Sequence, residues 1–257
     1  MANGEICLDV EFASLNKFDE AEILFDFQDE SHFMCAGVTN SPYKYEFKNF
    51  NGQWNWIRFT GNIMELPSTK YNLRVRINGS VIELYVNSIK VLNAISTTPI
   101  NKTNIGVWVR SKSSITLSNY RASYQKNSAF IVSQFGGDYD VLYNDVIKPV
   151  CEKHNYQSIR ADEINASSMI LKDIISLIEN ATIVIADISP DNPNVFYELG
   201  YAHALKKQTV LLCEKGCRNK LPFDISSFRT IFYDNTIGGK KLVENNLERF
   251  LKELSCN

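Results

Sequence analysis

The amino-acid sequence predicts two domains of different class: an all-β sandwich in residues 1–127 and an α/β domain with a parallel sheet in residues 128–257. The first half consists of short alternating or apolar runs separated by turn residues, with no long helical period. The second half alternates buried strand-like runs with helical segments. A length of 257 residues gives each domain room for a core, and 44% hydrophobic with 22% charged residues is typical of a globular protein.

The first half contains ten runs with the pattern of strands. The clearest hairpin signal is Asn78-Gly79, because an Asn-Gly pair readily takes the positive φ angles of a tight two-residue turn. We expect a second tight turn at Asn87-Ser88. Strands of this length and spacing are typical of a β-sandwich. The ten runs are residues 6–12, 21–27, 33–38, 43–47, 54–59, 71–77, 81–86, 89–92, 105–109 and 115–120.

The run from Tyr71 to Asn87 resembles a run of concanavalin-like and laminin-G-like modules. The resemblance implies a jelly-roll sandwich that holds a ligand, of unknown identity, on its concave face. Trp54, Trp56 and Trp108 offer a stacking platform for a sugar, but large aromatic side chains of sandwiches more often belong to the core, and we favour the core. We therefore expect this domain to sense a signal or drive assembly rather than catalyse a reaction.

A polar joint at residues 125–128 separates the domains. The alternation beyond it predicts a five-stranded parallel sheet of the flavodoxin-like kind, with strand order 2-1-3-4-5 and right-handed crossovers. Pro149 lies inside the first helix and predicts either a kink or a shortened helix. The expected strands are residues 129–135, 156–160, 183–188, 209–213 and 229–233, and the expected helices are residues 140–155, 167–180, one that begins at residue 193, and 238–254.

The third strand and the helix after it organise this domain. Residues 183–188 are apolar on both faces except for Asp187, which falls at the carboxyl end of the strand. Asn192-Pro193 has the pattern of a helix N-cap followed by proline at the first helical position. On that helix Asn194 and Glu198 lie one turn apart on one stripe. Because ligands of open α/β sheets bind outside the carboxyl ends of strands, we expect Asp187, Asn194 and Glu198 to converge on one cleft.

The first strand ends at the same rim of the sheet. Strands one and three are neighbours in the predicted order, at the point where the direction of the crossovers reverses. Phe135 ends strand one and Asp138 and Tyr139 follow it, so we expect all three to gather with Asp187 and Glu198.

Two other features of this rim allow two interpretations each. Gly136-Gly137 brings backbone amides and a helix N-terminus to the rim, which suits a phosphate or a ribose, but glycines also make ordinary tight turns. Arg160 ends the second strand, where it would either meet a phosphate or pair with Asp162 or Glu163.

The run from Ala186 to Lys207, Ala-Asp-Ile-Ser-Pro-Asp-Asn-Pro-Asn-Val-Phe-Tyr-Glu-Leu-Gly-Tyr-Ala-His-Ala-Leu-Lys-Lys, resembles the signature of the TIR-like and nucleoside 2-deoxyribosyltransferase-like families of bacterial nucleotide-processing proteins. The resemblance extends over roughly the second half of the chain. It implies that Glu198 carries N-glycosidic chemistry, either as the nucleophile toward the anomeric carbon or as the essential acid of an NAD-cleaving site.

The same resemblance implies roles for the residues around Glu198. Asp187 or Asn194 would hold ribose hydroxyls, and Phe135 or Tyr139 would stack on the departing base. It implies no metal and no cofactor, since NAD would be the substrate.

The leading hypothesis is an NAD glycohydrolase or related nucleotide N-glycosidase, because TIR-like domains joined to a sensing domain are typical of bacterial antiphage effectors. Two alternatives stay open: a nucleoside 2-deoxyribosyltransferase, and a non-catalytic receptor for a nucleotide messenger. The TIR resemblance also allows a cleft that becomes competent only on self-assembly.

The charge, hydropathy and cysteine content of the sequence limit the classes of partner that we expect. Residues 1–127 carry 13 basic and 12 acidic side chains and residues 128–257 carry 14 and 17, so nucleic acid is not expected as a partner. The sequence begins without a signal-peptide pattern and shows no membrane-spanning run, which predicts a cytoplasmic protein with no membrane partner. The six cysteines are scattered, so we expect free thiols rather than a metal site or disulfides.

Overall fold

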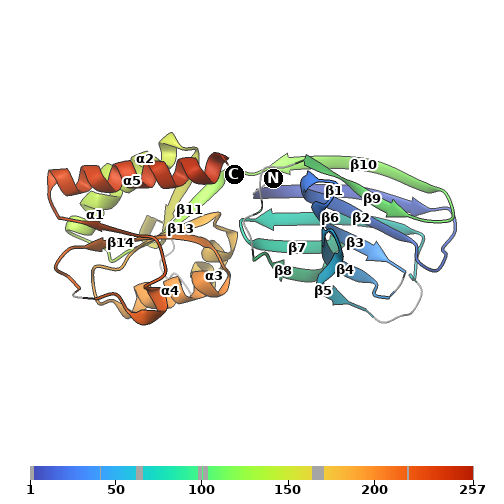
Figure 1. Ribbon diagram of the computed structural model, residues 1–257, viewed down its shortest axis with the longest axis horizontal. Coiled ribbons are helices and arrows are strands. Elements are labelled where there is room, and N and C mark those ends of the chain that lie inside the picture. Colours follow the sequence, from blue (N-terminus) through green and yellow to red (C-terminus); the bar gives the residue numbers. More distant parts are fainter. Residues whose placement is uncertain are drawn as a thin grey trace. The chain divides into compact units, whose positions relative to one another are not determined.

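The computed structural model describes residues 3–40, 42–61, 66–97, 100, 104–163, 171–218 and 220–256. The chain forms two compact units, Met1–Gln125 and Lys126–Asn257 (Figure 1). The predicted boundary, between residues 127 and 128, lies two residues further along the chain than the observed one.

The first unit is a sandwich of two antiparallel five-stranded sheets, with strand orders β10-β1-β6-β7-β8 and β5-β4-β3-β2-β9. All ten runs singled out in the sequence form strands. The strands are β1 (Asn3–Phe12), β2 (Glu20–Asp29), β3 (His32–Thr39), β4 (Tyr45–Asn51), β5 (Trp54–Thr60), β6 (Lys70–Asn78), β7 (Val81–Val86), β8 (Ile89–Ile95), β9 (Asn104–Arg110) and β10 (Ile115–Tyr124).

The two hairpin turns differ in type. Between β7 and β8, Asn87 and Ser88 have φ angles of 49° and 68°, so the predicted turn is confirmed. Between β6 and β7, Asn78 pairs with Val81, so the turn residues are Gly79 and Ser80 and the prediction was wrong by one residue. Gly79 has a φ of 57° and Ser80 does not take a positive φ, which is the type II′ arrangement with glycine first.

The core of the sandwich lies between its two sheets. Leu8 and Val75 come from one sheet, Ile23 and Phe47 come from the other, and all four side chains are fully buried. These residues alternate along their strands with outward-facing ones, as the two-residue period of a strand requires.

The three tryptophans lie outside this core, so the favoured core interpretation was wrong. Val107 packs against the core, and its neighbour Trp108 therefore faces the other side of the sheet. Trp54 and Trp108 meet edge to face with ring centroids 5.3 Å apart, and both contact the Phe33 ring. Trp56 is 47% exposed. The aromatic cluster thus belongs to the outer face of one sheet.

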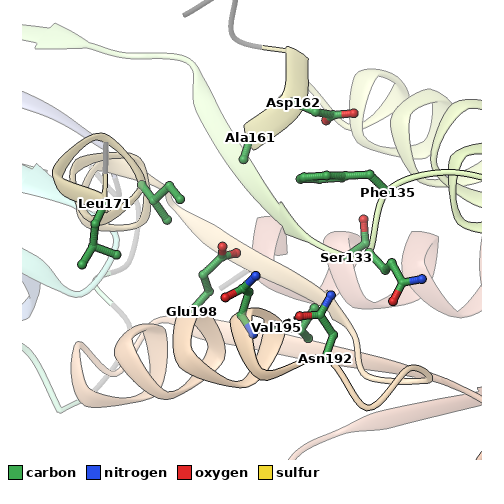
Figure 2. Close-up of a pocket in the computed structure, with 11 residues that line it drawn as sticks. Ser133, Phe135, Ala161, Asp162, Leu171, Asn192, Val195 and Glu198 are labelled. Atoms are coloured by element: carbon green, nitrogen blue, oxygen red, sulfur yellow. Dashed lines mark hydrogen bonds between the residues drawn. The ribbon is translucent and has the colours of Figure 1, made fainter. Parts of the chain in front are cut away.

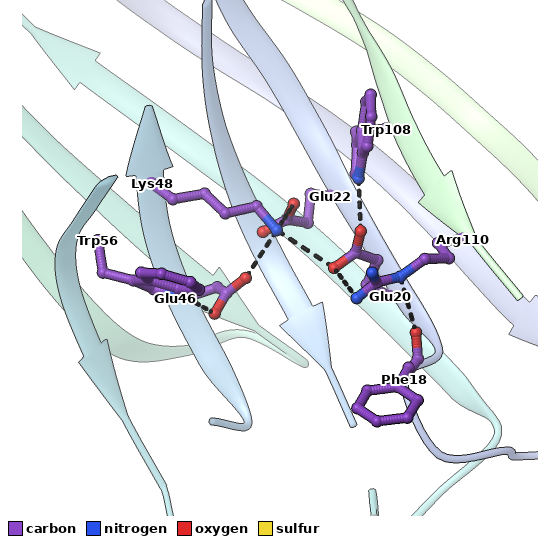
Figure 3. A network of polar contacts seen from close by, with 8 residues as sticks. All are labelled: Phe18, Glu20, Glu22, Glu46, Lys48, Trp56, Trp108 and Arg110. Carbon is purple, nitrogen blue, oxygen red and sulfur yellow. Dashed lines mark hydrogen bonds and ion pairs between the residues drawn. The ribbon is translucent and has the colours of Figure 1, made fainter. Parts of the chain in front are cut away.

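Next to the tryptophans, Lys48 is surrounded by three glutamates (Figure 3). Lys48 Nζ lies 2.8 Å from Glu46 Oε1 and 2.8 Å from Glu22 Oε2. It lies 3.2 Å from Glu20 Oε2, and none of these four side chains is more than 5% exposed. The three carboxylates are close enough to hold a metal ion, but the ammonium already lies between them. Burial raises the pKa of Glu22 to about 8, although Lys48 opposes the rise.

Side chains from the edge strands β5 and β9 hold Glu46 and Glu20 in place. Trp56 Nε1 donates to Glu46 Oε2 at 2.8 Å, and Trp108 Nε1 donates to Glu20 Oε1 at 2.5 Å. Arg110 Nη2 also donates to Glu20, at 3.2 Å. The indole rings therefore satisfy the carboxylates while they shield them from water.

Gly37 makes room for this network. It is paired with Glu22 on one side and with Glu46 on the other, and it has no side chain to separate their carboxylates. A Cβ atom at this position would lie 2.3 Å from the carbonyl oxygen of Ala21, so any other residue would force the strands apart.

The second unit has a five-stranded parallel sheet with order β12-β11-β13-β14-β15, which confirms the predicted 2-1-3-4-5 order. In Figure 1, α2 and α5 lie on one face of the sheet and α3 and α4 on the other. The strands are β11 (Asn127–Val132), β12 (Tyr156–Arg160), β13 (Ile183–Asp187), β14 (Gln208–Glu214) and β15 (Thr230–Tyr233). The α-helices are α1 (Asp138–Leu142), α2 (Lys148–Lys153), α3 (Leu171–Asn180), α4 (Pro193–Ala204) and α5 (Ile237–Cys256).

The first helical segment is interrupted before its proline. A π-helical turn, Tyr143–Ile147, joins α1 to α2, and Pro149 occupies the first turn of α2. Proline lacks the amide of an α-helical hydrogen bond and its ring collides with the preceding turn, and the wider π turn relieves both problems. The predicted kink is therefore an interruption of the hydrogen-bond pattern. Residues 167–170, where the sequence predicts the start of α3, lie outside the described residues.

Two further sequence predictions concern the chain as a whole. Within the described ranges, no helix is long and apolar enough to cross a membrane. Five cysteines, at positions 7, 35, 151, 213 and 217, have free thiols.

Replacing Lys48 by methionine should destabilise the sandwich by about 3–5 kcal/mol, because three buried carboxylates would lose their shared cation. All three tryptophans lie in the first unit, so their fluorescence during urea unfolding follows this unit alone. The control is Lys70→Met, since Lys70 is 70% exposed and pairs only at the surface with Glu11. It should cost less than about 1 kcal/mol. Equal losses in the two variants would contradict the central role of Lys48.

Candidate active site

A cavity of about 670 Å³ opens beyond the carboxyl ends of β11 and β12, beside the first turns of α3 and α4 (Figure 2). This is the rim where the crossover direction reverses, since β11 lies between β12 and β13. Its lining residues are Ser133, Gln134, Phe135, Ala161, Asp162, Leu171, Ile174, Asn192, Asn194, Val195 and Glu198.

Helix α4 carries Glu198 into the cavity. The Asn192 side chain accepts a hydrogen bond from the Asn194 amide at 3.0 Å, and Pro193 occupies the first helical position, so the predicted N-cap is confirmed. Val195 and Leu199 are buried against the sheet and anchor the helix. With that face anchored, the Glu198 carboxyl projects into the cavity, as Figure 2 shows.

The Glu198 carboxyl is partly buried and, within the described part of the chain, has no hydrogen-bond or ion-pair partner. Leu171, Ile174 and Val195 line the same cavity and supply no donor from their side chains. Burial raises the pKa of Glu198 from its ordinary 4.5 to about 7. A carboxyl with this pKa changes its charge near neutral pH, as a general acid or base must.

Phe135 and Asn194 are the other predicted site residues that line the cavity. Phe135 is 52% exposed, and its ring lies over the Arg160 guanidinium with 5.5 Å between the ring centroid and Cζ. Asn194 is exposed in the first turn of α4, one helical turn from Glu198. The structure therefore brings together an aromatic ring, an amide and a carboxyl.

Asp187 lies outside the cavity lining, although it does end β13 as predicted. It is 3% exposed, and its Oδ1 accepts from the Ser189 amide at 2.9 Å and from Ser189 Oγ at 2.6 Å. Its Oδ2 accepts from the Tyr233 hydroxyl at 2.8 Å. Burial raises the pKa of Asp187, and these hydrogen bonds oppose the rise. In this structure Asp187 ties the end of β13 to β15.

Asp138 and Tyr139 also lie outside the cavity lining. Asp138 Oδ2 accepts from Asn235 Nδ2 at 2.7 Å. Burial, and then the charge of nearby Asp187, raise the pKa of Tyr139. The Gly136 amide donates to Asp140 Oδ1 at 3.0 Å, so the glycine turn closes on itself instead of presenting that amide to a ligand.

Arg160 pairs with Asp162, which is one of the two interpretations that the sequence left open. Its Nε and Nη2 donate to the two Asp162 carboxylate oxygens, each at 2.7 Å. Its Nη1 lies 2.9 Å from Asp140 Oδ1. The Arg160 side chain is only 5% exposed, so the pair is anchored inside the protein. Glu163 instead accepts from Lys148 at 2.7 Å.

Sequence reasoning did not place Asp162 in the cavity, nor Ser133, Gln134 and the apolar wall of Leu171 and Ile174. The available signal was position, because Asp162 follows the end of β12 and Ser133 follows the end of β11. The parallel order brings these two chain ends to the same rim.

The arrangement suits chemistry at a carbon that becomes positively charged. Glu198 can supply a negative charge or accept a proton, and water is partly excluded by the apolar wall. Phe135 offers an exposed face to a flat ring, and Asn194 offers a donor and an acceptor.

No protein-family model matches the chain, and no curated protein matches it either. Among solved structures, it is similar to the carbohydrate-binding module CBM66 from Bacillus subtilis (16% identity, TM-score 0.42, covering 48% of this chain and 75% of that one). It is also similar to the galectin LEC-6 of Caenorhabditis elegans (13% identity, TM-score 0.37, covering 48% of this chain and 83% of that one). A third similar structure is a CMP N-glycosidase of Clostridium botulinum (17% identity, TM-score 0.39, covering 48% of this chain and 99% of that one). Similarities of this size support no conclusion about activity or ligand.

Glu198 should make the second unit less stable as the pH rises. Its folded pKa is above its unfolded value, so the folded state holds the proton more tightly, and stability is lost between about pH 4.5 and 7. Glu198→Gln should raise the free energy of unfolding by about 1–2 kcal/mol at pH 8 and by much less at pH 5. Pulse proteolysis in urea, read on fragments of the second unit, measures both values. The exposed Glu152→Gln is the control, and a gain at pH 8 in both variants would contradict the prediction.

Proposed function

We propose that the second unit is an N-glycosidase that cleaves the bond between ribose and base in NAD or a related nucleotide, with Glu198 as the key carboxylate. The observation that carries the proposal is a partly buried carboxyl that has no partner among the described residues and projects into a cavity at the switch point of a parallel sheet. A carboxyl in that position costs stability, and a catalytic task explains why the cost is tolerated. The resemblance of residues 186–207 to the TIR-like and deoxyribosyltransferase-like signature supports the same chemistry.

The reaction needs a negative charge beside the anomeric carbon. When the C1′–N bond of NAD breaks, its electron pair passes to the pyridinium nitrogen, and nicotinamide leaves as a neutral molecule. The ribosyl group is left with oxocarbenium character, which the Glu198 carboxylate stabilises or captures covalently. Water then adds at C1′. On the covalent route it displaces the Glu198 carboxylate as the C1′–O bond to Glu198 breaks, and on either route the free Glu198 carboxylate takes the proton of the water.

Two neighbours of Glu198 receive roles in this proposal. Asn194 would hold a ribose hydroxyl, and the exposed face of Phe135 would stack on the base. Asp187, Asp138 and Tyr139 receive no direct role, because they lie outside the cavity lining.

The sandwich would supply control. A sensing or assembly unit joined to an enzyme that consumes NAD suits an effector of bacterial antiphage defence, in which a signal releases the activity. The Lys48 network gives the sandwich a rigid outer face with exposed Trp56 beside it, a suitable place for a ligand. Self-assembly of the chain would be a second way to release the activity.

Incubation of the full chain with NAD should release nicotinamide, and Glu198→Gln should lower the rate by about 100-fold or more. The rate should rise as the pH increases from 6 to 8, because the ionised fraction of a carboxyl with a pKa of about 7 grows from about 10% to about 90%. Chromatography of the products at several protein concentrations measures the rate and tests for assembly. Glu152→Gln is the matched control and should keep the full rate.

The rival functions give different outcomes. A deoxyribosyltransferase would ignore NAD and exchange bases between deoxynucleosides only when a second base is present. A messenger receptor would bind a nucleotide saturably in calorimetry with no turnover at any protein concentration. Equal activity of the wild-type protein and Glu198→Gln would remove Glu198 from the chemistry.

A further inference from the structure

The cavity contains two acids and, among the described residues, no lysine, arginine or histidine in its lining. Glu198 enters it from α4, and Asp162 enters it from the short segment after β12 (Figure 2). A cavity with this charge attracts cations and hydrogen-bond donors and repels anions.

Arg160 lies behind this wall, and its guanidinium is paired with two carboxylates. Two of its nitrogens hold Asp162, and the third lies 2.9 Å from Asp140. The Tyr143 ring lies against it, with 4.3 Å between the ring centroid and Cζ, and Phe135 covers it on the cavity side. Arg160 therefore positions Asp162 and the Phe135 ring and does not present a free charge to a ligand.

Asp162 is held in place as a hydrogen-bond acceptor. A bidentate guanidinium contact stabilises a carboxylate and fixes its plane. Each Asp162 oxygen accepts one hydrogen bond from Arg160 and keeps further acceptor capacity. The side chain is 33% exposed, so this capacity is open to a ligand in the cavity. Phe135 stands beside it, as Figure 2 shows, so a ring stacked on Phe135 would bring its edge near the carboxylate.

The N-terminus of α4 does not offset the negative charge that the two acids give the cavity. Asn192 already accepts from the Asn194 amide, and an asparagine cap adds no positive charge. The start of α4 is thus partly satisfied by its own cap.

We propose that Asp162, positioned by Arg160, selects the ligand: it binds a cationic or hydrogen-bond-donating ring that stacks on Phe135, so the cavity accepts uncharged or cationic ribosides and keeps phosphate outside. The proposal rests on the proposed function, since it names the substrate class of the same site. It assigns the pyridinium riboside end of a dinucleotide to the cavity and leaves the phosphates to solvent.

Three probes of similar shape differ in the charge on the ring or on the ribose, so they test which charge the cavity accepts. Nicotinamide riboside is cationic, nicotinic acid riboside adds a carboxylate to the ring, and nicotinamide mononucleotide adds a phosphate to the ribose. Calorimetry with the full-length Glu198→Gln protein measures binding without turnover. Nicotinamide riboside should bind at least about tenfold more tightly than nicotinic acid riboside, a zwitterion whose ring carboxylate would face Asp162, and no less tightly than the mononucleotide, whose phosphate stays in solvent.

The decisive variant is Asp162→Asn in the same Glu198→Gln background. It should weaken binding of nicotinamide riboside by about tenfold. The affinities of nicotinamide riboside and nicotinic acid riboside should then lie within about twofold of each other. Asp145→Asn is the control, since Asp145 is exposed on the π turn and does not line the cavity, and it should change neither value. Thermal unfolding monitors the fold of each variant. If Asp162→Asn does not fold, the salt dependence of riboside binding to the Glu198→Gln protein tests the same charge, because attraction to an acid weakens with salt.

Each outcome decides the proposal. Unchanged binding in Asp162→Asn, tighter binding of the mononucleotide, salt-independent binding of the riboside, or no binding of any probe would overturn it. Riboside binding that depends on Asp162 in a protein that never releases nicotinamide would uphold this inference and overturn the proposed function. Turnover of NAD with binding indifferent to Asp162 would do the reverse.

Discussion

The strand order of the parallel sheet is the constraint on which the site depends. Because β11 lies between β12 and β13, the connection after β11 runs over one face and the connection after β12 runs over the other. The loops therefore separate at the carboxyl end of β11, and the cavity opens there. Five residues separate β13 from helix α4, which leaves Glu198 in the second turn of the helix at this opening. No long loop is needed to bring the side chains together.

Two acids in the same cavity are held in opposite ways. Asp162 accepts two hydrogen bonds from a buried guanidinium, which fix the orientation of its carboxyl group. Glu198 receives none from the described residues and faces an apolar wall, which favours its neutral form. Such a division of environments gives carboxyls in one site different tasks. Here it gives Asp162 a fixed orientation for recognition and leaves Glu198 able to change its protonation near neutral pH.

The sequence predicted the elements better than it predicted the contacts. Strand runs, the Asn192 cap and the order of the parallel sheet follow from local patterns and from general rules of chain connection, and these were right. Asp187 and Arg160 were harder, because their neighbours come from elsewhere in the chain. Tyr233 is 46 residues from Asp187, and no periodicity shows that its hydroxyl will take one of the two carboxylate oxygens.

The tryptophans show the same limit on the sandwich. A two-residue period tells which residues share a face of a strand, but it does not tell which face is the core when both are apolar or paired. Trp108 faces away from the core because Glu20, on the neighbouring strand β2, offers its indole N–H an acceptor. That partner is 88 residues away in the chain. Sequence pattern alone could not join the tryptophans to the buried glutamates.

A raised pKa does not by itself mark the functional acid in this chain. Burial raises the pKa of Glu22, Asp187 and Glu198 alike. Glu22 has a buried ammonium 2.8 Å away, and Asp187 accepts three hydrogen bonds, so both are explained by the structure that they hold together. Among these three, Glu198 alone faces a cavity and has no protein partner in the described residues to justify its burial. Burial of the Glu198 carboxyl lowers the stability of the fold, and no contact within the described residues compensates for it. A bound substrate would supply that contact.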